Sequence, residues 1–317
     1  MKKIAVLTRD CAGVNAAIRS IVRTADSYGI EVIGIKRGYD GLIDGDIVAL
    51  NRQSVSGIIN AGGTILKTSR SQRFYKESGQ QQAVKTIIDN KIKGLIVIGG
   101  NGSLTAAHIL ATKFKVPIVG IPTTIDNDIT GVDRCLGADT ALNVAIDALD
   151  KIRDTATSLE RIFIVEVMGR NCGYIALNVA LAGGCEEVLV PEMDMDLDLI
   201  CNEIKDGNKN GKVSWIIIVA EGKAKGQDIA NHITKKTNLE TRVAVLGHIQ
   251  RGGRPTIIDR ILAARLGNYA VNLLRDGGTD QCVSFKDNKL YTIPLNIAIQ
   301  PKDIDINSYY KLIKILT

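Results

Sequence analysis

The sequence is poor in aromatic residues and proline, and it lacks a long apolar run. Aromatic residues make up 4% of its 317 residues, and there are six prolines. No stretch approaches the roughly 18 consecutive apolar residues of a membrane span, so we expect no membrane partner. The apolar start of the chain ends at Arg9 and Asp10 before any cleavage-like site, which argues against a signal peptide. We therefore predict a soluble, cytoplasmic protein.

The sequence also lacks paired cysteines and runs of like charge. Its six cysteines form no CxxC pair and no Cys/His cluster at zinc-ligand spacing, so we expect reduced, mostly buried thiols and no disulfide framework. The 40 lysines and arginines exceed the 34 aspartates and glutamates by six. This mild, scattered excess does not predict a nucleic-acid partner, but it fits pockets for small anionic molecules.

Length and hydrophobicity predict about two folded domains, because 45% of the residues are hydrophobic. Short runs rich in valine and isoleucine alternate with glycine-marked turns and helical periodicity. This pattern predicts an α/β fold with two interwoven Rossmann-like lobes, each a mainly parallel sheet covered by helices. The expected strands are 3–8, 30–35, 94–99, 116–121, 161–167, 188–190, 214–220 and 242–246. The expected helices are 80–93, 137–157, 195–207, 225–236 and 257–275.

Two neighbouring strand ends carry residues suited to phosphate chemistry, and ligands of doubly wound sheets bind at such ends. The segment 99–103, GGNGS, has three glycines that let backbone amides approach a phosphate. The segment 123–128, TTIDND, places two carboxylates two residues apart. One carboxylate can act as a base towards a hydroxyl while the other helps to hold a magnesium-bound phosphate. An ordinary tight turn is the alternative for the first segment, and an Asx turn for the second.

Two later strand ends place an arginine beside glycines. They are 168–173, MGRNCG, and 247–253, GHIQRGG. A guanidinium in such a setting suits bidentate recognition of phosphate, although a lone example is more often solvated or a helix cap. Arg161 and Arg242 at strand starts enlarge the set, and Glu221 at a strand end can accept hydrogen bonds from a sugar hydroxyl.

The first strand end, 8–19, runs from TRDCAGVN into a helix without matching either common nucleotide motif. It is neither the GxGxxG of dinucleotide-binding proteins nor the GxxxxGK[ST] of phosphate loops. A nicotinamide-dependent oxidoreductase, which the alternating fold alone would allow, is therefore improbable.

Five segments in order resemble the bacterial type of the ATP-dependent 6-phosphofructokinase family, and the resemblance covers nearly the whole chain. The segments are 15–19, 99–103, 124–128, 166–170 and 247–253. The resemblance implies a glycolytic kinase that forms a homotetramer. The kinase would transfer a phosphoryl group from Mg²⁺-bound ATP to the 1-hydroxyl of fructose 6-phosphate. The products would be fructose 1,6-bisphosphate and ADP. We assign the donor lobe to 1–137 plus 251–300, and the acceptor lobe to 138–250 plus 301–317.

The resemblance also implies roles for individual residues. Asp126 takes the proton of the 1-hydroxyl, while Thr124, Arg70 and Arg170 lie near the transferred group; Asp128 and Asn101 lie near Mg²⁺. The implied ATP-binding residues are Arg9, Asp10, Arg70, Gly100, Asn101, Gly102 and Ser103. The implied sugar-phosphate residues are Arg161, Met168, Gly169, Arg170, Glu221, Arg242, His248 and Arg251, of which Arg161 and Arg242 reach the site from a neighbouring subunit. The implied effector residues, where ADP activates or phosphoenolpyruvate inhibits, are Arg19, Arg23, Arg52, Arg153, Glu186 and Lys212.

The donor side departs from the family pattern. The family's first loop usually has two glycines before its aspartate, whereas here it is shorter and carries Arg9. Arg9 either replaces backbone amides with a guanidinium or fills the phosphate pocket. Asn101 replaces a usual aspartate, and Thr123 is neither the glycine of ATP enzymes nor the lysine of pyrophosphate enzymes. Gly102 matches the ATP users, since pyrophosphate-dependent relatives typically carry aspartate there. A pyrophosphate-dependent enzyme and a catalytically weak regulatory subunit that binds sugar phosphate or nucleotide remain the alternatives.

Overall fold

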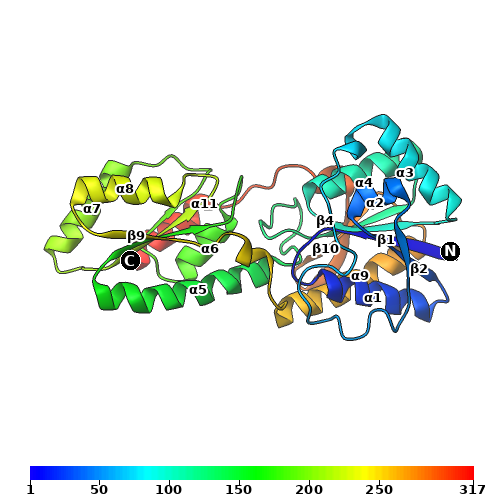
Figure 1. The fold of residues 1–317 in the computed structure, drawn as a ribbon, viewed down its shortest axis with the longest axis horizontal. Coiled ribbons are helices and arrows are strands. Elements are labelled where there is room, and N and C mark those ends of the chain that lie inside the picture. The colour runs from blue at the N-terminus through cyan, green and yellow to red at the C-terminus, as the bar shows by residue number, and fades with distance from the viewer. The chain divides into compact units, whose positions relative to one another are not determined.

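The computed structural model describes residues 1–317, and these fall into two compact units (Figure 1). Unit 1 comprises Met1–Thr140 and Arg251–Lys302, and unit 2 comprises Ala141–Gln250 and Asp303–Thr317. Because the chain passes from one unit to the other more than once, the units are interwoven in sequence, and neither is a separate module strung on a linker.

Unit 1 is built on a seven-stranded, mostly parallel sheet with the order β11-β10-β5-β4-β1-β2-β3. Its strands are β1 (Lys3–Thr8), β2 (Glu31–Ile35), β3 (Ile47–Leu50), β4 (Leu95–Gly99), β5 (Ile118–Pro122), β10 (Gln281–Lys286) and β11 (Lys289–Pro294). Only the edge strands β3 and β11 pair antiparallel with their neighbours. The central strands β4 and β5 are buried along their whole length, as strands covered on both faces require.

Helices cover both faces of this sheet (Figure 1). The helices of unit 1 are α1 (Val14–Ser27), α2 (Gly38–Asp44), α3 (Glu77–Asp89), α4 (Asn101–Phe114), α9 (Ile257–Arg275) and α10 (Leu295–Ala298), with a 3-10 turn η1 (Arg73–Tyr75). The helices α1 and α9 lie side by side on one face, and α2, α3 and α4 lie on the other. The entry to α1 depends on Gly13, which has φ 90° and where a Cβ would lie 2.7 Å from Leu136 Cδ1.

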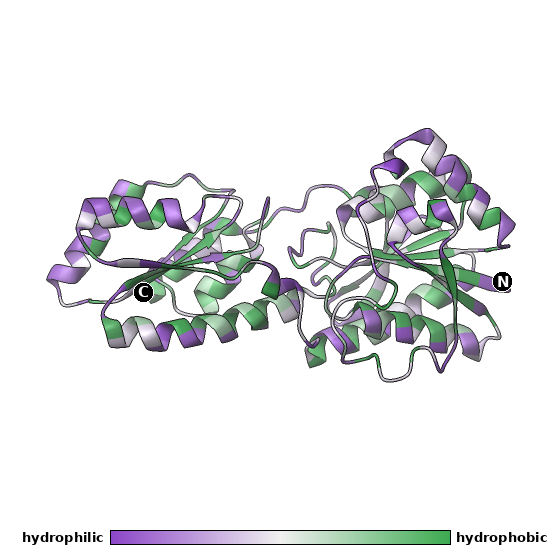
Figure 2. Ribbon diagram, viewed as in Figure 1, coloured by the Kyte–Doolittle hydropathy of each residue, from purple (hydrophilic) through white to green (hydrophobic).

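Unit 2 is built on a four-stranded parallel sheet with the order β7-β8-β6-β9. Its strands are β6 (Ile162–Val167), β7 (Glu187–Leu189), β8 (Trp215–Ala220) and β9 (Thr241–Val245). Its helices are α5 (Ala138–Leu159), α6 (Tyr174–Ala182), α7 (Leu197–Lys209), α8 (Gly226–Thr237) and α11 (Ile306–Leu316), with a 3-10 turn η2 (Gly247–Arg251). Isoleucines of α7 and α8 pack against those of β6 and β8, and Figure 2 shows the hydrophobic character of the strands.

The predicted fold class is confirmed, and all eight predicted strands and all five predicted helices are present. The hairpin of β10 and β11 was not predicted, although its turn carries a signal. Asp287 and Asn288 have φ values of 49° and 60°, the left-handed pair that a two-residue hairpin turn needs. The short edge strand β3 and the helices α2, α6, α10 and α11 were also missed.

The six cysteines are free and buried, as predicted. Burial raises the pKa of the Cys135 thiol to about 12, so this group is a neutral thiol at physiological pH. None of the helices is long and apolar enough to span a membrane.

Candidate active site

The carboxyl ends of β1, β4 and β5 form one edge of the sheet in unit 1. The register pairs Thr8 with Ile98 and Gly99 with Pro122, so the segments that follow these strands start side by side. The chain winds from β1 to β2 on one side, and β4 lies on the other, which makes this edge a topological switch point. The structure therefore brings together three of the predicted donor-side segments, namely 9–10, 100–103 and 123–128.

The amino end of α4 faces this edge without a side-chain cap. Gly100 is the N-cap residue, and its carbonyl accepts the amides of Ser103 and Leu104. The first amides of the helix, those of Asn101 and Gly102, precede any intrahelical partner, and such amides favour an anion. A Cβ at Gly102 would meet nothing within 4 Å, so packing does not demand glycine at this position.

Asn101 and Asp128 form a pair of oxygen ligands beside this helix end. The Asn101 Nδ2 group donates to Asp128 Oδ2 at 2.8 Å, while Asn101 Oδ1 and Asp128 Oδ1 are both buried without a hydrogen-bond partner. Two orphaned oxygens, one of them carrying carboxylate charge, fit a hard cation such as Mg²⁺. No cluster of three or more His, Cys, Asp or Glu ligands exists in the chain, so such an ion would need further oxygens from phosphate or water.

The loop that carries Asp126 is held by residues that the sequence analysis did not select. Thr124 Oγ1 accepts the Asp126 amide at 3.2 Å, which closes a local turn. Asn127 is buried with φ 51°; its side chain donates to the Asp133 carbonyl at 3.0 Å and accepts the Cys135 amide at 2.7 Å. Lys302 donates to the Asn127 carbonyl at 2.9 Å from the far end of the sequence. These bonds fix a half-buried Asp126 on a well-braced loop.

Three arginines approach one another at this edge. Arg9 continues β1, since its amide donates to the Ile98 carbonyl at 2.9 Å. Burial lowers the pKa of Arg9, and the positive charges of Arg70 and Arg251 lower it further. The one carboxylate that opposes this trend is Asp10, which is exposed. The edge is therefore strongly cationic.

The carboxyl ends of β6, β8 and β9 form the corresponding edge in unit 2. Met168 is buried, and its amide donates to Gln250 Oε1 at 2.8 Å. Gly169 has φ 136°, and a Cβ there would lie 2.4 Å from the Cys172 carbonyl oxygen, so only glycine fits. Gln250, which the sequence analysis missed, thus holds the strand end from a buried position.

The structure gathers five of the predicted sugar-phosphate residues at this edge of unit 2. They are Met168, Gly169, Arg170, Glu221 and His248, of which the last three are exposed. Arg251 belongs to unit 1, where its charge acts on Arg9.

Arg161 and Arg242 lie at the opposite, amino end of β6 and β9. Arg161 Nε donates to Glu240 Oε2 at 2.8 Å, and Arg242 forms an ion pair with the same carboxylate. The six residues of β6 separate this end from Met168 by about 20 Å at ~3.3 Å per residue. The structure therefore brings the two arginines together, but it does not bring them to the other predicted sugar-phosphate residues of the same chain.

The predicted effector residues divide into two groups. Arg19 and Arg23 lie on α1 of unit 1, where Arg52 pairs with Asp26 at 3.0 Å. In unit 2, Lys212 pairs with Glu186 at 3.1 Å. The remaining member, Arg153, donates to the carbonyls of Gly183 and Gly184. Each group is a local polar cluster on its own unit.

Comparison with known proteins agrees with this architecture. A model of the family described as Phosphofructokinase matches residues 3–274. The ATP-dependent 6-phosphofructokinases of Thermotoga petrophila and Clostridium tetani are each 49% identical over 319 residues, covering 100% of both chains. The solved phosphofructokinase of Saccharomyces cerevisiae superposes with a TM-score of 0.87 at 33% identity, over 94% of this chain and 45% of that chain.

A pyrophosphate-dependent phosphofructokinase from Marinobacter aquaeolei has a TM-score of 0.86 at 20% identity, covering 100% of this chain and 91% of that one, and shares the fold. The two helix-covered sheets with glycine and carboxylate residues at their strand ends define an α/β protein of Rossmann-like architecture. Within that class, the chain belongs to the phosphofructokinase family.

Proposed function

We propose that this protein is an ATP-dependent 6-phosphofructokinase of glycolysis. It transfers the γ-phosphoryl group of ATP to the 1-hydroxyl of fructose 6-phosphate and yields fructose 1,6-bisphosphate and ADP. The single observation that carries the proposal is the edge of unit 1, where a braced Asp126, the orphaned oxygens of Asn101 and Asp128 and the uncapped start of α4 come together. Full-length relatives named ATP-dependent 6-phosphofructokinase support the choice of reaction.

Asp126 is the base of this reaction. Its carboxylate takes the proton of the sugar's 1-hydroxyl, whose oxygen forms a bond to the γ-phosphorus as the bond to the ADP oxygen breaks. Thr124, Arg70 and Arg170 stabilise the charge on the transferred group, because phosphoryl transfer depends mainly on positioning and electrostatics. Asn101 and Asp128 hold Mg²⁺, which when bound neutralises charge on the phosphate oxygens.

The remaining assignments divide between donor and acceptor. ATP is bound by Asp10, Arg70, Gly100, Asn101, Gly102 and Ser103, in the lobe of 1–137 plus 251–300, and Arg9 is considered below. The sugar phosphate is bound by Met168, Gly169, Arg170, Glu221, His248 and Arg251, mostly from the lobe of 138–250 plus 301–317. The accessible carboxylate of Glu221 and the guanidinium of Arg170 support sugar and phosphate binding respectively.

A homotetramer is part of the proposal. Arg161 and Arg242 bind the sugar phosphate of a neighbouring subunit, which their position at the opposite sheet edge from Met168 supports. Arg19, Arg23, Arg52, Arg153, Glu186 and Lys212 bind the effectors ADP or phosphoenolpyruvate, and the cationic character of both groups supports an anionic ligand. A cytoplasmic location also belongs to the proposal, supported by the free thiols.

The test is a coupled assay with fructose 6-phosphate and Mg²⁺, run with ATP and with pyrophosphate at matched concentrations. Turnover with ATP alone is the expected result. Turnover with pyrophosphate alone would make Gly102 a misleading guide to the donor. Turnover with neither, while fructose 6-phosphate still binds, would favour a regulatory subunit. Adding ADP or phosphoenolpyruvate to the same assay tests the effector assignment.

Removing the Asp126 carboxylate tests the mechanism. We expect Asp126→Ala to lower kcat by about 10³-fold or more, within the range for loss of a general base, and to leave the Kd for fructose 6-phosphate within about threefold. Asp133→Ala is the matched control, because this exposed aspartate of the same loop contributes its carbonyl, not its carboxylate, to the bond with Asn127. Substantial turnover by Asp126→Ala would remove Asp126 from its role.

A further inference from the structure

Arg9 occupies the topological switch point of unit 1. Its backbone extends β1, and its side chain runs against the end of β4, since a Cβ on Gly99 would lie 3.1 Å from Arg9 Cγ. The uncapped amides that open α4 follow directly after Gly99. The guanidinium therefore stands where doubly wound sheets bind ligands and beside a helix end that favours anions.

The guanidinium of Arg9 is anchored through one nitrogen only. Nη1 donates to Thr68 Oγ1 at 3.2 Å and to the Ser69 carbonyl at 2.5 Å. A guanidinium has five N–H donors, and those on Nε and Nη2 have no partner within the chain. The Arg9 side chain is thus fixed in place, while its Nε and Nη2 groups are free to donate to a ligand.

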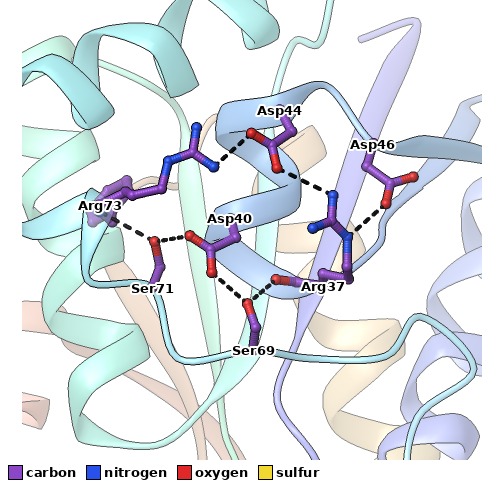
Figure 3. Close-up of polar contacts among 8 residues, drawn as sticks. Arg37, Asp40, Asp44, Asp46, Ser69, Ser71 and Arg73 are labelled. Carbon is purple, nitrogen blue, oxygen red and sulfur yellow. Dashed lines mark hydrogen bonds and ion pairs between the residues drawn. The ribbon is translucent and has the colours of Figure 1, made fainter.

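The segment that anchors Arg9 is itself braced by α2, as Figure 3 shows. Asp40 accepts the hydroxyl of Ser71 at 2.5 Å, and the Ser69 hydroxyl shares its one proton between Asp40 at 2.8 Å and the Arg37 carbonyl at 2.9 Å. The carbonyl that receives the Arg9 guanidinium therefore belongs to a fixed loop, so the free donors of Arg9 have a fixed direction.

Arginines of the same region that only stabilise the fold look different. Arg37 pairs with Asp44 at 3.2 Å and Asp46 at 3.0 Å, and Arg73 pairs with Asp44 at 2.7 Å (Figure 3). Arg9 has no such carboxylate on its guanidinium, is half-buried, and shares its surroundings with Arg70 and Arg251. A half-buried guanidinium that has no carboxylate partner lowers the stability of the folded protein. Such an arrangement is typical of a site that binds an anion.

We propose that the Arg9 guanidinium binds the phosphate chain of the nucleotide donor. Its free Nε and Nη2 groups donate to phosphate oxygens held at the start of α4, so a guanidinium contributes the contacts that a longer loop would make with backbone amides. This inference rests on the proposal that ATP is the donor. It differs from the alternative in which the Arg9 side chain fills the phosphate pocket and blocks the nucleotide. Bidentate guanidinium–phosphate pairing supplies both charge and direction.

The test measures the Kd of Mg·ADP by isothermal titration calorimetry for the wild type, Arg9→Ala, Arg9→Lys and the control Arg73→Ala. Saturating phosphoenolpyruvate is present throughout, because it occupies the proposed effector site and leaves the donor site as the one titrated. We expect Arg9→Ala to weaken Mg·ADP about 10- to 100-fold, because it removes charge-assisted hydrogen bonds from a half-buried site. Arg9→Lys retains the charge without the fork, so an intermediate loss is expected. The Kd of fructose 6-phosphate should stay within about threefold throughout. Arg73→Ala should bind Mg·ADP as the wild type does.

An unchanged or tighter Kd for Mg·ADP in Arg9→Ala would overturn the proposal, and a tighter one would identify Arg9 as a plug. If Arg9→Ala does not fold, Arg9→Lys decides the matter, since wild-type affinity with lysine would contradict bidentate binding. The proposed function can fail independently of this inference. A wild type that binds Mg·ADP but does not turn over ATP would contradict the kinase assignment, and the affinities of the Arg9 variants for Mg·ADP would still test the role of Arg9.

Discussion

At the scale of single residues, the hydrogen bond between Asn101 and Asp128 is the main feature of the proposed metal site. An amide donates to the carboxylate where two carboxylates would repel each other, so the site carries less negative charge than one with two acidic ligands. Compared with two carboxylates, the pair attracts a metal ion less strongly, but it forms an internal hydrogen bond. It also leaves two buried oxygens without a partner in the chain, and a bound cation would offset the cost of their desolvation.

Asn101→Asp tests this trade. The substitution replaces the bond to Asp128 with charge repulsion, so we expect the Mg²⁺-free protein to lose about 1–2 kcal/mol of unfolding free energy. Excess Mg²⁺ should raise the Tm of Asn101→Asp more than that of the wild type, because two carboxylates bind the ion more tightly. Thermal unfolding followed by circular dichroism with and without MgCl₂ checks both effects. An equal Mg²⁺ response in both proteins would show that this pair does not hold the ion.

The sequence was informative about residues that act through local pattern. Paired aspartates flanked by threonines, and glycines beside arginine, mark the strand ends, and these segments do lie at sheet edges. The residues it missed act across long separations: Lys302 meets Asn127 over 175 positions, and Gln250 meets Met168 over 82. A single sequence carries no signal for such contacts, because each partner alone is an ordinary polar residue.

At the scale of secondary structure, the hydrogen bonds from Asp40 of α2 to the segment 69–71 fix the backbone beside Arg70. Asp40 accepts hydrogen bonds from the residues on both sides of Arg70, namely Ser69 and Ser71 (Figure 3). Arg70 is exposed, so its own packing does not fix the backbone from which it projects. If Arg70 binds phosphate as proposed, the helix contributes to that binding without touching the ligand.

Asp40→Ala should reveal this positioning role. The substitution removes the Asp40 acceptor from both hydroxyls and leaves Ser69 with the Arg37 carbonyl alone. We expect kcat/KM for ATP to fall about tenfold and the KM for fructose 6-phosphate to stay unchanged, at a cost of about 1–2 kcal/mol of stability. Asp40→Asn, which retains one acceptor oxygen, should restore part of the loss. Asp46→Ala is the control, since Asp46 contributes only an exposed ion pair with Arg37. If Asp40→Ala and Asp46→Ala have the same kinetics, α2 has no positioning role.

Strands of the core were easier to predict than strands at the sheet edges. The buried strands β4, β5 and β8 read as continuous apolar runs because helices cover both their faces. The strands β3 and β11 lie at the sheet edge and are only partly buried, so their composition is mixed and the periodic signal is weak. Turn chemistry at 287–288 was the one local sign of the missed hairpin.

At the scale of the whole molecule, one chain divides its predicted phosphate-binding residues between opposite edges of a sheet. Glu240 holds Arg161 and Arg242 together at the amino end, about 20 Å along β6 from Met168. Residues so separated cannot bind one sugar phosphate within the same subunit. The division of the chain into a donor lobe and an acceptor lobe stays a prediction, and so does the homotetramer that would combine their residues.

Mixing two defective proteins tests whether the site is shared between subunits. Asp126→Ala lacks the base, and Arg161→Ala combined with Arg242→Ala lacks the sugar-phosphate arginines. Each should be nearly inactive alone. If a site takes Asp126 from one subunit and the arginines from its neighbour, unfolding and refolding the two together should restore about a quarter of wild-type activity, because random assembly leaves that share of sites intact.

The control mixes Asp126→Ala with Arg170→Ala, whose residues are assigned to the site of a single chain. Every site assembled from these two chains retains one defect, so no activity should return. Recovery in the first mixture and none in the control would require subunits that exchange Arg161 and Arg242 across an interface. If the wild type regains its activity on refolding but neither mixture does, the shared site is contradicted, because Arg161 and Arg242 would then be needed within their own subunit.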